Sequence, residues 1–126
     1  MTIFLNLSSR DSLRYHPNNE WHDFTVELPH SIEGKFKCAL LEFYSQSALV
    51  EDIYVFSNIC EPEYTRDSVL PLLRIVSESG EVSHPYYKEV SREVIQRVHI
   101  YIKDQNLNVP PNPVGSVRMT LALEPI

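Results

Sequence analysis

Apolar and polar residues alternate with a period of two along several segments of the chain. The clearest alternation covers residues 94–103, VIQRVHIYIK. The face that this pattern turns inward is aliphatic and consists of Val94, Val98, Ile100 and Ile102. The opposite face is polar and consists of Arg97, His99, Tyr101 and Lys103. Because side chains of an extended strand alternate between its two faces, this pattern predicts a half-buried β-strand.

Two further segments, 22–28 and 116–123, show the same alternation. The first turns Phe24, Val26 and Leu28 inward. The second turns inward Val117, Met119, Leu121 and Leu123. Other segments rich in apolar residues predict four more strands and a weaker fifth at 83–87; the four are 2–7, 35–44, 52–59 and 70–77.

Clusters of proline, glycine and asparagine separate these segments, at 16–19, 28–34, 77–81 and 108–115. Proline lacks the backbone donor that a central strand needs, so each cluster is expected to end a strand. Helix is scarce. The best helical candidate is 88–95, KEVSREVI, and short helical inserts are also expected near 30–33 and 64–69.

This pattern predicts an all-β fold, a sandwich of about eight antiparallel strands with short helical inserts. No repeat, linker or low-complexity tract divides the chain, so residues 1–126 are expected to form one domain. The jelly roll is the eight-stranded sandwich, but the strand count alone does not separate it from other Greek-key sandwiches.

The composition argues against several partners. The chain has 17 acidic residues against 11 Lys and Arg, and the basic residues are scattered singly, so direct nucleic-acid binding is not expected. No apolar segment approaches the roughly 18 residues that a membrane span needs. The N-terminal segment has no basic region ahead of an apolar one, so an intracellular, soluble protein is expected.

The histidines raise the question of a metal or acid–base site. His16 and His22 lie close to Glu20 and Asp23, but no third ligand is evident nearby, and zinc usually takes three or four protein ligands. None of the five histidines forms the HxH pair of a cupin-type jelly roll. The two are therefore interpreted as loop histidines, and no metal is expected.

Nucleophilic chemistry has no better support. No GxSxG motif is present, and three glycines in the whole chain are too few for a glycine-rich phosphate loop. Cys38 lies in an apolar run and neither it nor Cys60 has the sequence signature of an activated thiol. A buried free thiol is the expected state, with a disulfide as the alternative. No catalytic residue, cofactor-binding residue or cofactor is predicted, and the chain is not expected to be an enzyme.

Arg74 is the one charge inside an apolar predicted strand, LPLLRIV. An unpaired charge is costly to bury. Either Arg74 lies on an exposed edge or it pairs with a carboxylate, within the fold or across a subunit boundary. Pairing is the favoured interpretation.

Three stretches, taken in order, resemble the minor capsid (penton) proteins of Maverick/Polinton elements and the related adintoviruses. The first is SLRYHPNNEWHDFTVELP followed by KFKCALLEF, and the second is IYVFSNICEPEYTRDSVLPLLRIV. The third is VIQRVHIYIKDQNLNVPPNPVGSVRMTLAL. The likeness covers nearly the whole chain and keeps its order.

The resemblance implies a single jelly roll that assembles as a homopentamer at the fivefold vertices of an icosahedral capsid. The pentamer would be surrounded by trimers of a double jelly-roll major capsid protein, and the chain would be a structural part of the virion, assembled in the host nucleus. Two fused jelly rolls would not fit into 126 residues. The resemblance leaves open whether a fibre or spike docks on the ring.

A cyclic pentamer places one flank of each subunit against the opposite flank of its neighbour. The residues expected at or near these subunit contacts are Arg74, Arg97, His99, Tyr101 and Lys103. The alternative, from another functional class, is a β-sandwich attachment module that binds carbohydrate or protein. Its candidate contact residues are the aromatics Tyr15, Trp21, Tyr86 and Tyr87. A cupin-like enzyme comes third.

Three positions depart from the family pattern. Arg66 stands before Asp67 where glycine is expected, and Asn106-Leu107 replaces a glycine turn. Ala122-Leu123 stands where an aromatic ending is common. These departures leave the turn geometry and the last strand open.

Overall fold

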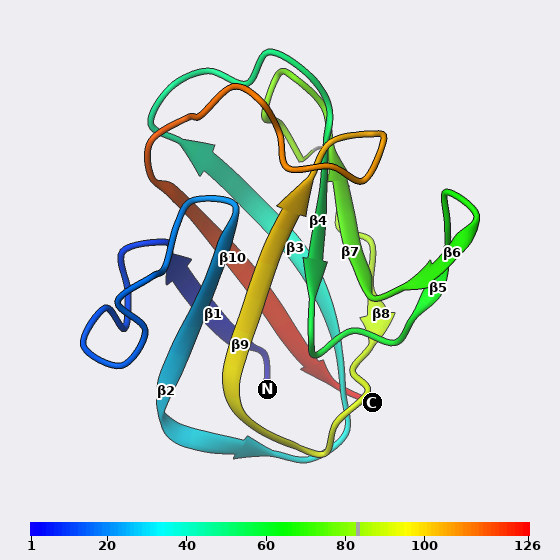
Figure 1. Cartoon of the computed structure of the whole chain (residues 1–126). Coiled ribbons are helices and arrows are strands. Elements are labelled where there is room, and N and C mark those ends of the chain that lie inside the picture. Colours follow the sequence, from blue (N-terminus) through cyan, green and yellow to red (C-terminus); the bar gives the residue numbers. More distant parts are fainter. Residues whose placement is uncertain (83) are drawn as a thin grey trace.

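The computed structural model describes residues 1–82 and 84–126, and its main body is two antiparallel β-sheets packed face to face (Figure 1). In sheet order, the first consists of β1 (Ile3–Ser8), β10 (Val117–Pro125), β3 (Phe36–Ser45) and β8 (Lys88–Glu89). The second consists of β2 (Asp23–Glu33), β9 (Val94–Lys103), β4 (Ile53–Ser57) and β7 (Leu72–Val76). A separate hairpin projects from the body and consists of β5 (Glu63–Thr65) and β6 (Ser68–Leu70).

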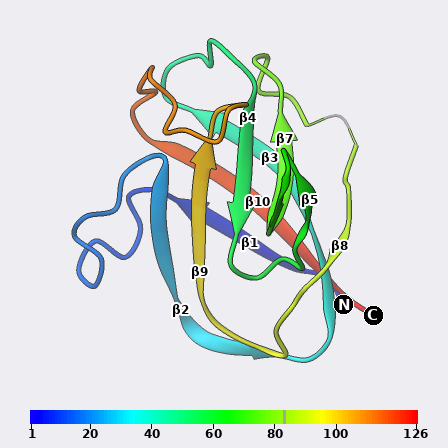
Figure 2. The ribbon, with the colours of Figure 1, turned by 45° about the vertical axis from the view of Figure 1, so that its right-hand side comes forward.

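Successive strands alternate between the two sheets, except where β7 follows β4 within one sheet. The first and last strands, β1 and β10, are neighbours, so both termini lie at the same end of the molecule (Figure 2). Two four-stranded sheets wound in this order form a jelly roll. The predicted all-β sandwich is therefore confirmed.

Seven of the predicted strands overlap observed strands, and the weak one at 83–87 does not. Residues 84–87 form no strand, and residue 83 lies outside the described residues. The eighth strand of the sandwich is instead β8, which pairs Lys88 and Glu89 with β3.

The predicted helical inserts are wrong, because the described residues contain no helix. Segment 88–95 pairs with β3 and then enters β9, residues 30–33 continue β2, and residues 64–69 form the β5–β6 hairpin. Sheet partners satisfy the backbone groups of these short segments, which outweighs a weak local helix preference. Nothing in the described part of the chain is a helix that could span a membrane.

The core lies between the sheets and is aliphatic and aromatic. Its fully buried side chains include Phe24, Leu40, Ile53, Ile100 and Leu121, one from each of five strands. Burying a side chain of this size contributes about 1.5–3 kcal/mol. The predicted inward faces of β2 and β10 are confirmed by the burial of Phe24, Val26 and the alternate residues of β10.

One predicted inward residue, Val94, is exposed, and its neighbour Ile95 is buried instead. The β2–β9 register shifts here, since Glu27 pairs with Arg97 but Ile32 pairs with Ile95. The intervening part of β2 contains Pro29, which cannot donate to the ladder. This irregularity shifts the inward and outward alternation by one residue at the start of β9, so Ile95 and not Val94 faces the core.

The residues that stand where the family pattern has glycine adopt left-handed backbone conformations. Arg66 and Asp67 have φ of 48° and 66°, and together they form the two-residue type I′ turn of the β5–β6 hairpin. Leu107 has φ of 62°. The geometry that glycine would allow is therefore adopted by residues with side chains, at a cost in backbone energy. Ala122 and Leu123 are both buried in β10.

Candidate subunit-contact surface

Strand β9 presents four of the five predicted contact residues on the outer face of the β2–β9–β4–β7 sheet. Val98, Ile100 and Ile102 are wholly buried. The residues between and beside them are exposed or half-buried and are Arg97, His99, Tyr101 and Lys103. Their predicted position on the outward face is thus found, while their role in subunit contact stays a prediction.

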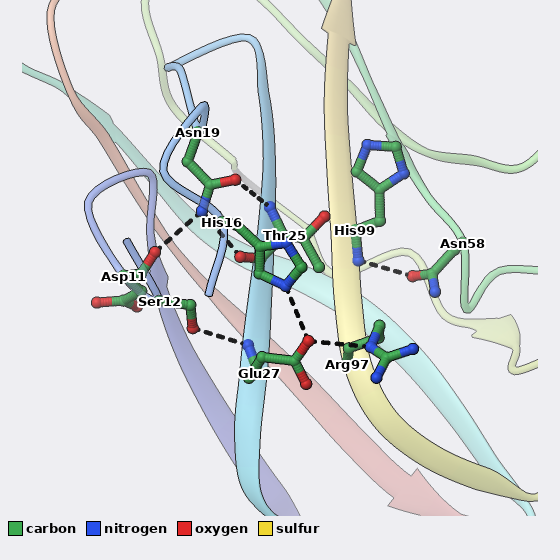
Figure 3. Close-up of polar contacts among 9 residues, drawn as sticks. All are labelled: Asp11, Ser12, His16, Asn19, Thr25, Glu27, Asn58, Arg97 and His99. Carbon is green, nitrogen blue, oxygen red and sulfur yellow. Dashed lines mark hydrogen bonds and ion pairs between the residues drawn. The ribbon is translucent and has the colours of Figure 1, made fainter. Parts of the chain in front are cut away.

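Glu27 on β2 lies at the centre of the polar network on this face (Figure 3). Arg97 Nε donates to its Oε1 at 3.0 Å, and His16 Nε2 lies 2.8 Å from the same oxygen. The His16 hydrogen bond, with the nearby Arg97 guanidinium, lowers the pKa of the Glu27 carboxyl from its ordinary value. The face therefore carries a carboxylate with two cationic or hydrogen-bonding neighbours.

His16 reaches Glu27 because the loop 9–22 is held against β2. The Asn19 side chain accepts from the Thr25 backbone N–H at 3.0 Å and donates to the Thr25 carbonyl at 2.9 Å and the Asp11 carbonyl at 3.0 Å. Ser12 Oγ accepts from the backbone N–H of Glu27 at 2.8 Å. Since β2 is an edge strand, these side chains take the place of a neighbouring strand.

His99 and Tyr101 extend the face toward β4. His99 Nε2 lies 2.7 Å from Asp23 Oδ1, and the His99 backbone N–H donates to Asn58 Oδ1 at 2.8 Å. The Tyr101 ring stacks on Phe56 with centroids 4.9 Å apart. Burial, followed by the negative charge of Asp23, raises the pKa of Tyr101.

Lys103 lies at the end of β9, opposite Tyr54 of β4. Within the described residues it makes no ion pair, unlike Arg97 and His99. It is the one predicted contact residue of β9 whose charge has no carboxylate partner in that part of the chain.

Arg74 lies apart from the other four, on the edge strand β7. The β4–β7 register shifts between Val55 and Phe56, which leaves one extra residue on β7. Such a bulge redirects side chains: Leu73 is wholly buried, and the Arg74 guanidinium donates to the backbone carbonyl of His84. Arg74 is half-buried on an edge strand, and among the described residues it makes no ion pair with a carboxylate of its own chain. Pairing across a subunit boundary stays a prediction.

The histidines that raised the question of a metal site pair with carboxylates. His16 contacts Glu27, and His22 Nε2 lies 2.7 Å from Glu20 Oε2. The described residues hold no group of three or more His, Cys, Asp and Glu side chains that could bind a metal ion. The sequence placed Glu20 beside His22, but it offered no signal that Glu27 would meet His16.

A cavity of about 310 Å³ lies beside Arg74, between β7 and the segment leading into β8. Its wall includes Lys88, which is buried, forms an ion pair with Glu63 at 2.6 Å and donates to the Leu72 carbonyl. The sequence analysis did not single out Lys88, because its burial follows from the pairing of β8 with β3, where a helix was predicted.

The aromatic residues considered for ligand binding do not gather at one place. Tyr15 lines a shallow depression with Arg97, whereas Tyr86 lines the cavity beside Arg74. Tyr87 donates to Glu124 at 2.9 Å. Trp21 lines a groove of about 550 Å³ at one end of the sandwich, together with Leu13, Val109, Pro110 and Pro113.

No protein-family model and no curated protein matches the chain. What the structure shows is the fold alone, an all-β sandwich of two four-stranded antiparallel sheets.

Proposed function

We propose that the chain is a penton subunit of the Maverick/Polinton and adintovirus type, a structural virion protein that forms homopentamers at the fivefold vertices of a capsid. One observation carries the proposal: the stretches that resemble this family form, in order, the strands of one jelly roll. FTVELP lies in β2, FKCALLEF in β3, LLRIV is β7, and the closing pair forms β9 and β10. No catalytic step is assigned to the chain.

The shape of the sandwich supports a ring. The strand orders place β1 and β2 along one flank and β7 and β8 along the other (Figure 1). A closed ring brings these unlike flanks together, since cyclic assemblies with five members use heterologous contacts. The predicted contact residues lie toward both flanks, Arg74 on β7 and the Arg97 network beside β2.

The β2 flank offers carboxylates to the flank on which Arg74 lies. Arg74 has no carboxylate partner among the described residues of its own chain. The β2 flank carries Glu20 and Asp23, with exposed side chains. A neighbouring subunit would thus supply the carboxylate that Arg74 lacks, and opposed charges of this kind set the register of an interface.

In a capsid, the pentamer would be surrounded by trimers of the double jelly-roll major capsid protein. We place the chain at the vertex of a virion assembled in the host nucleus, with a fibre or spike as a further partner to be sought on its outer surface.

The proposal is tested by native mass spectrometry and electron microscopy of the chain, purified alone and co-expressed with a double jelly-roll major capsid protein. We expect five-membered rings, alone or at the vertices of particles. An Arg74→Glu variant should fold but lose the rings, whereas Arg92→Glu, the same charge change at an exposed residue, should keep them.

Two outcomes would count against this assignment. Absence of five-membered rings in both preparations removes the penton function. An Arg74→Glu variant that folds and assembles like the parent removes Arg74 from the contact while leaving the pentamer in place.

The groove beside Trp21 favours the alternative function, an attachment module that binds carbohydrate or protein. Apolar side chains and a tryptophan in an open groove are typical of sugar stacking surfaces. Trp21 is the chain's one tryptophan, so its fluorescence reports this groove directly. Saturable quenching by a simple sugar, abolished by Val109→Arg, would support the alternative.

A further inference from the structure

Two thiols meet in the core between the sheets. Cys38 of β3 is wholly buried, and Cys60, which follows β4, is 2% exposed. Both are free, as expected from the sequence, and their Sγ atoms lie 3.8 Å apart. The pair therefore connects β3 of one sheet with the segment that leaves β4 of the other.

Local structure explains why the two side chains meet. Cys38 points inward because Phe36, Cys38 and Leu40 form the buried face of β3. Cys60 is held by a bridge to Val90 and by its N–H, which donates to the Ser57 carbonyl at 3.2 Å. A disulfide bond is about 2.05 Å long, so the sulfurs must approach by about 1.8 Å. Cys60 lies outside the named strands, so this approach requires a shift of the segment between β4 and β5.

The contact between the two thiols shifts their pKa values in opposite directions. The Sγ atoms lie within hydrogen-bond distance, and this contact lowers the pKa of Cys38. The same contact, together with burial, raises the pKa of Cys60. Of the two thiols, Cys38 is therefore the one that ionises more easily.

Access of an oxidant to this pair requires local opening at the edge of the sandwich, because both thiols are buried. Lys88 lies opposite Cys38 in the β3–β8 ladder and also lines the cavity of about 310 Å³ beside Arg74. The main chains of ladder partners are about 5 Å apart, so Lys88 connects the strand of Cys38 to the cavity, whose lining includes neither thiol. Hydrogen peroxide is little larger than water, whereas glutathione would have to open the core.

We propose that Cys38 and Cys60 form a reversible intramolecular disulfide that joins the two sheets when the chain meets hydrogen peroxide. The Cys38 thiolate attacks one peroxide oxygen, the O–O bond breaks, and a sulfenic acid and hydroxide result. The hydroxide takes the Cys60 proton, and the Cys60 sulfur displaces the hydroxyl group from Cys38. The displaced hydroxide takes up the proton that Cys38 lost when it ionised. The two thiols thus lose two electrons in total, and the peroxide becomes two water molecules.

This inference does not depend on the proposed function, because both cysteines belong to one chain and no assembly is required. The bond would close a loop between residues 22 apart in sequence and tie one sheet to the other. Such a crosslink restricts the unfolded chain and should raise the resistance of the folded chain to denaturant.

The test treats the reduced, folded chain with increasing hydrogen peroxide, then unfolds it, alkylates free thiols and measures intact and peptide masses. A methionine-containing peptide in the same tube reports the oxidant dose. We expect a mass loss of two hydrogen atoms, a linked pair of peptides containing Cys38 and Cys60, and a higher urea midpoint. Dithiothreitol should reverse all three changes.

Single variants test the order of the steps. In Cys60→Ala, Cys38 should stop at a sulfenic acid that dimedone traps, whereas in Cys38→Ala the Cys60 thiol should remain unreacted. The inference is overturned if both thiols of the parent are still alkylated when the peptide is fully oxidised, or if the disulfide joins two chains. The parent's mass alone decides this, even if a variant folds poorly.

Discussion

Glu27 takes its properties from residues that are far away in sequence. Its carboxylate contacts His16 in the preceding loop and Arg97, which lies 70 residues further along the chain. The two contacts lower its pKa, and its backbone N–H is bound by Ser12. One residue thus joins a loop and two strands on the outer face of the sheet.

The lowered pKa of Glu27 makes stability depend on pH. The unfolded chain binds a proton at Glu27 near its ordinary pKa of 4.5, and the folded chain binds it only at lower pH. The contribution of Glu27 to stability is therefore complete above pH 4.5 and is lost as the pH falls through the folded pKa. A Glu27→Gln variant should lose less stability than the parent in this acid range.

Urea unfolding across a pH series measures this effect. Glu42→Gln, at an exposed carboxylate of the other sheet, is the matched control and should follow the parent. Parallel curves for the parent and Glu27→Gln would show that the carboxylate does not contribute.

The left-handed conformation of Leu107 is a second effect at the residue scale. Its turn is organised by Asp104, whose Oδ1 accepts from the N–H groups of Asn106 at 2.9 Å and Asn108 at 3.0 Å. A side chain in this conformation costs about 1–2 kcal/mol, partly offset by the greater chain entropy of unfolded glycine. Leu107→Gly should therefore stabilise the fold by about 0.5–1 kcal/mol.

Chemical denaturation of Leu107→Gly and Leu107→Ala checks this prediction. Alanine removes the side chain but keeps the strain, so it should give no gain. Equal losses in both variants would mean that the contacts of the leucine side chain outweigh the strain.

At the scale of elements, β8 is a strand of two residues that carries a buried ion pair. Lys88 and Glu89 pair with β3, and the buried Lys88 ammonium meets Glu63 of β5, which is one third exposed. The pair links the projecting hairpin to the edge of the sandwich. This ion pair therefore has a structural role at the edge of the sandwich, beside the cavity and the two thiols.

Removing one partner of this pair should cost more than removing both. Glu63→Leu leaves the Lys88 ammonium buried without its carboxylate and should destabilise the fold by about 1–3 kcal/mol, less than for a fully buried pair because solvent reaches Glu63. The double variant Glu63→Leu with Lys88→Met should lie close to the parent.

A double-mutant cycle by urea unfolding separates these effects. Additive losses in the double variant would show that the two side chains do not interact energetically.

At the scale of the whole molecule, the two sheets enclose one core, and β1 closes it by pairing with β10. The loop 9–22 belongs to the same unit, because Trp21 packs against the core and Asn19 and Ser12 bind β2. The chain is therefore expected to unfold as one cooperative domain.

Trp21 fluorescence and far-ultraviolet circular dichroism, followed in the same urea titration, test this expectation. The two transitions should have the same midpoint and slope. A tryptophan transition at lower urea would show that the loop opens before the sandwich unfolds. Asn19→Ala, which removes three hydrogen bonds of the loop, should then separate the two curves further.

The sequence alone determined the all-β class, the position of seven strands and most of their inward faces. This was possible because side chains of an extended backbone alternate between two faces. When one face is buried in the core, every second residue must be apolar, and the sequence shows this pattern. The outward position of Arg97, His99, Tyr101 and Lys103, and the inward position of Cys38, follow from the same rule.

Only the tertiary structure decided the sheet order, the two-residue strand β8, the bulge that turns Arg74 aside, and the partners of Glu27. Each depends on contacts between segments far apart in the chain, such as β1 with β10 or His16 with Glu27. The hydrophobic pattern of one segment does not determine which distant segment it will pair with. The short segments predicted as helices became strands for this reason, since a neighbouring strand offered hydrogen bonds that a single helical turn could not.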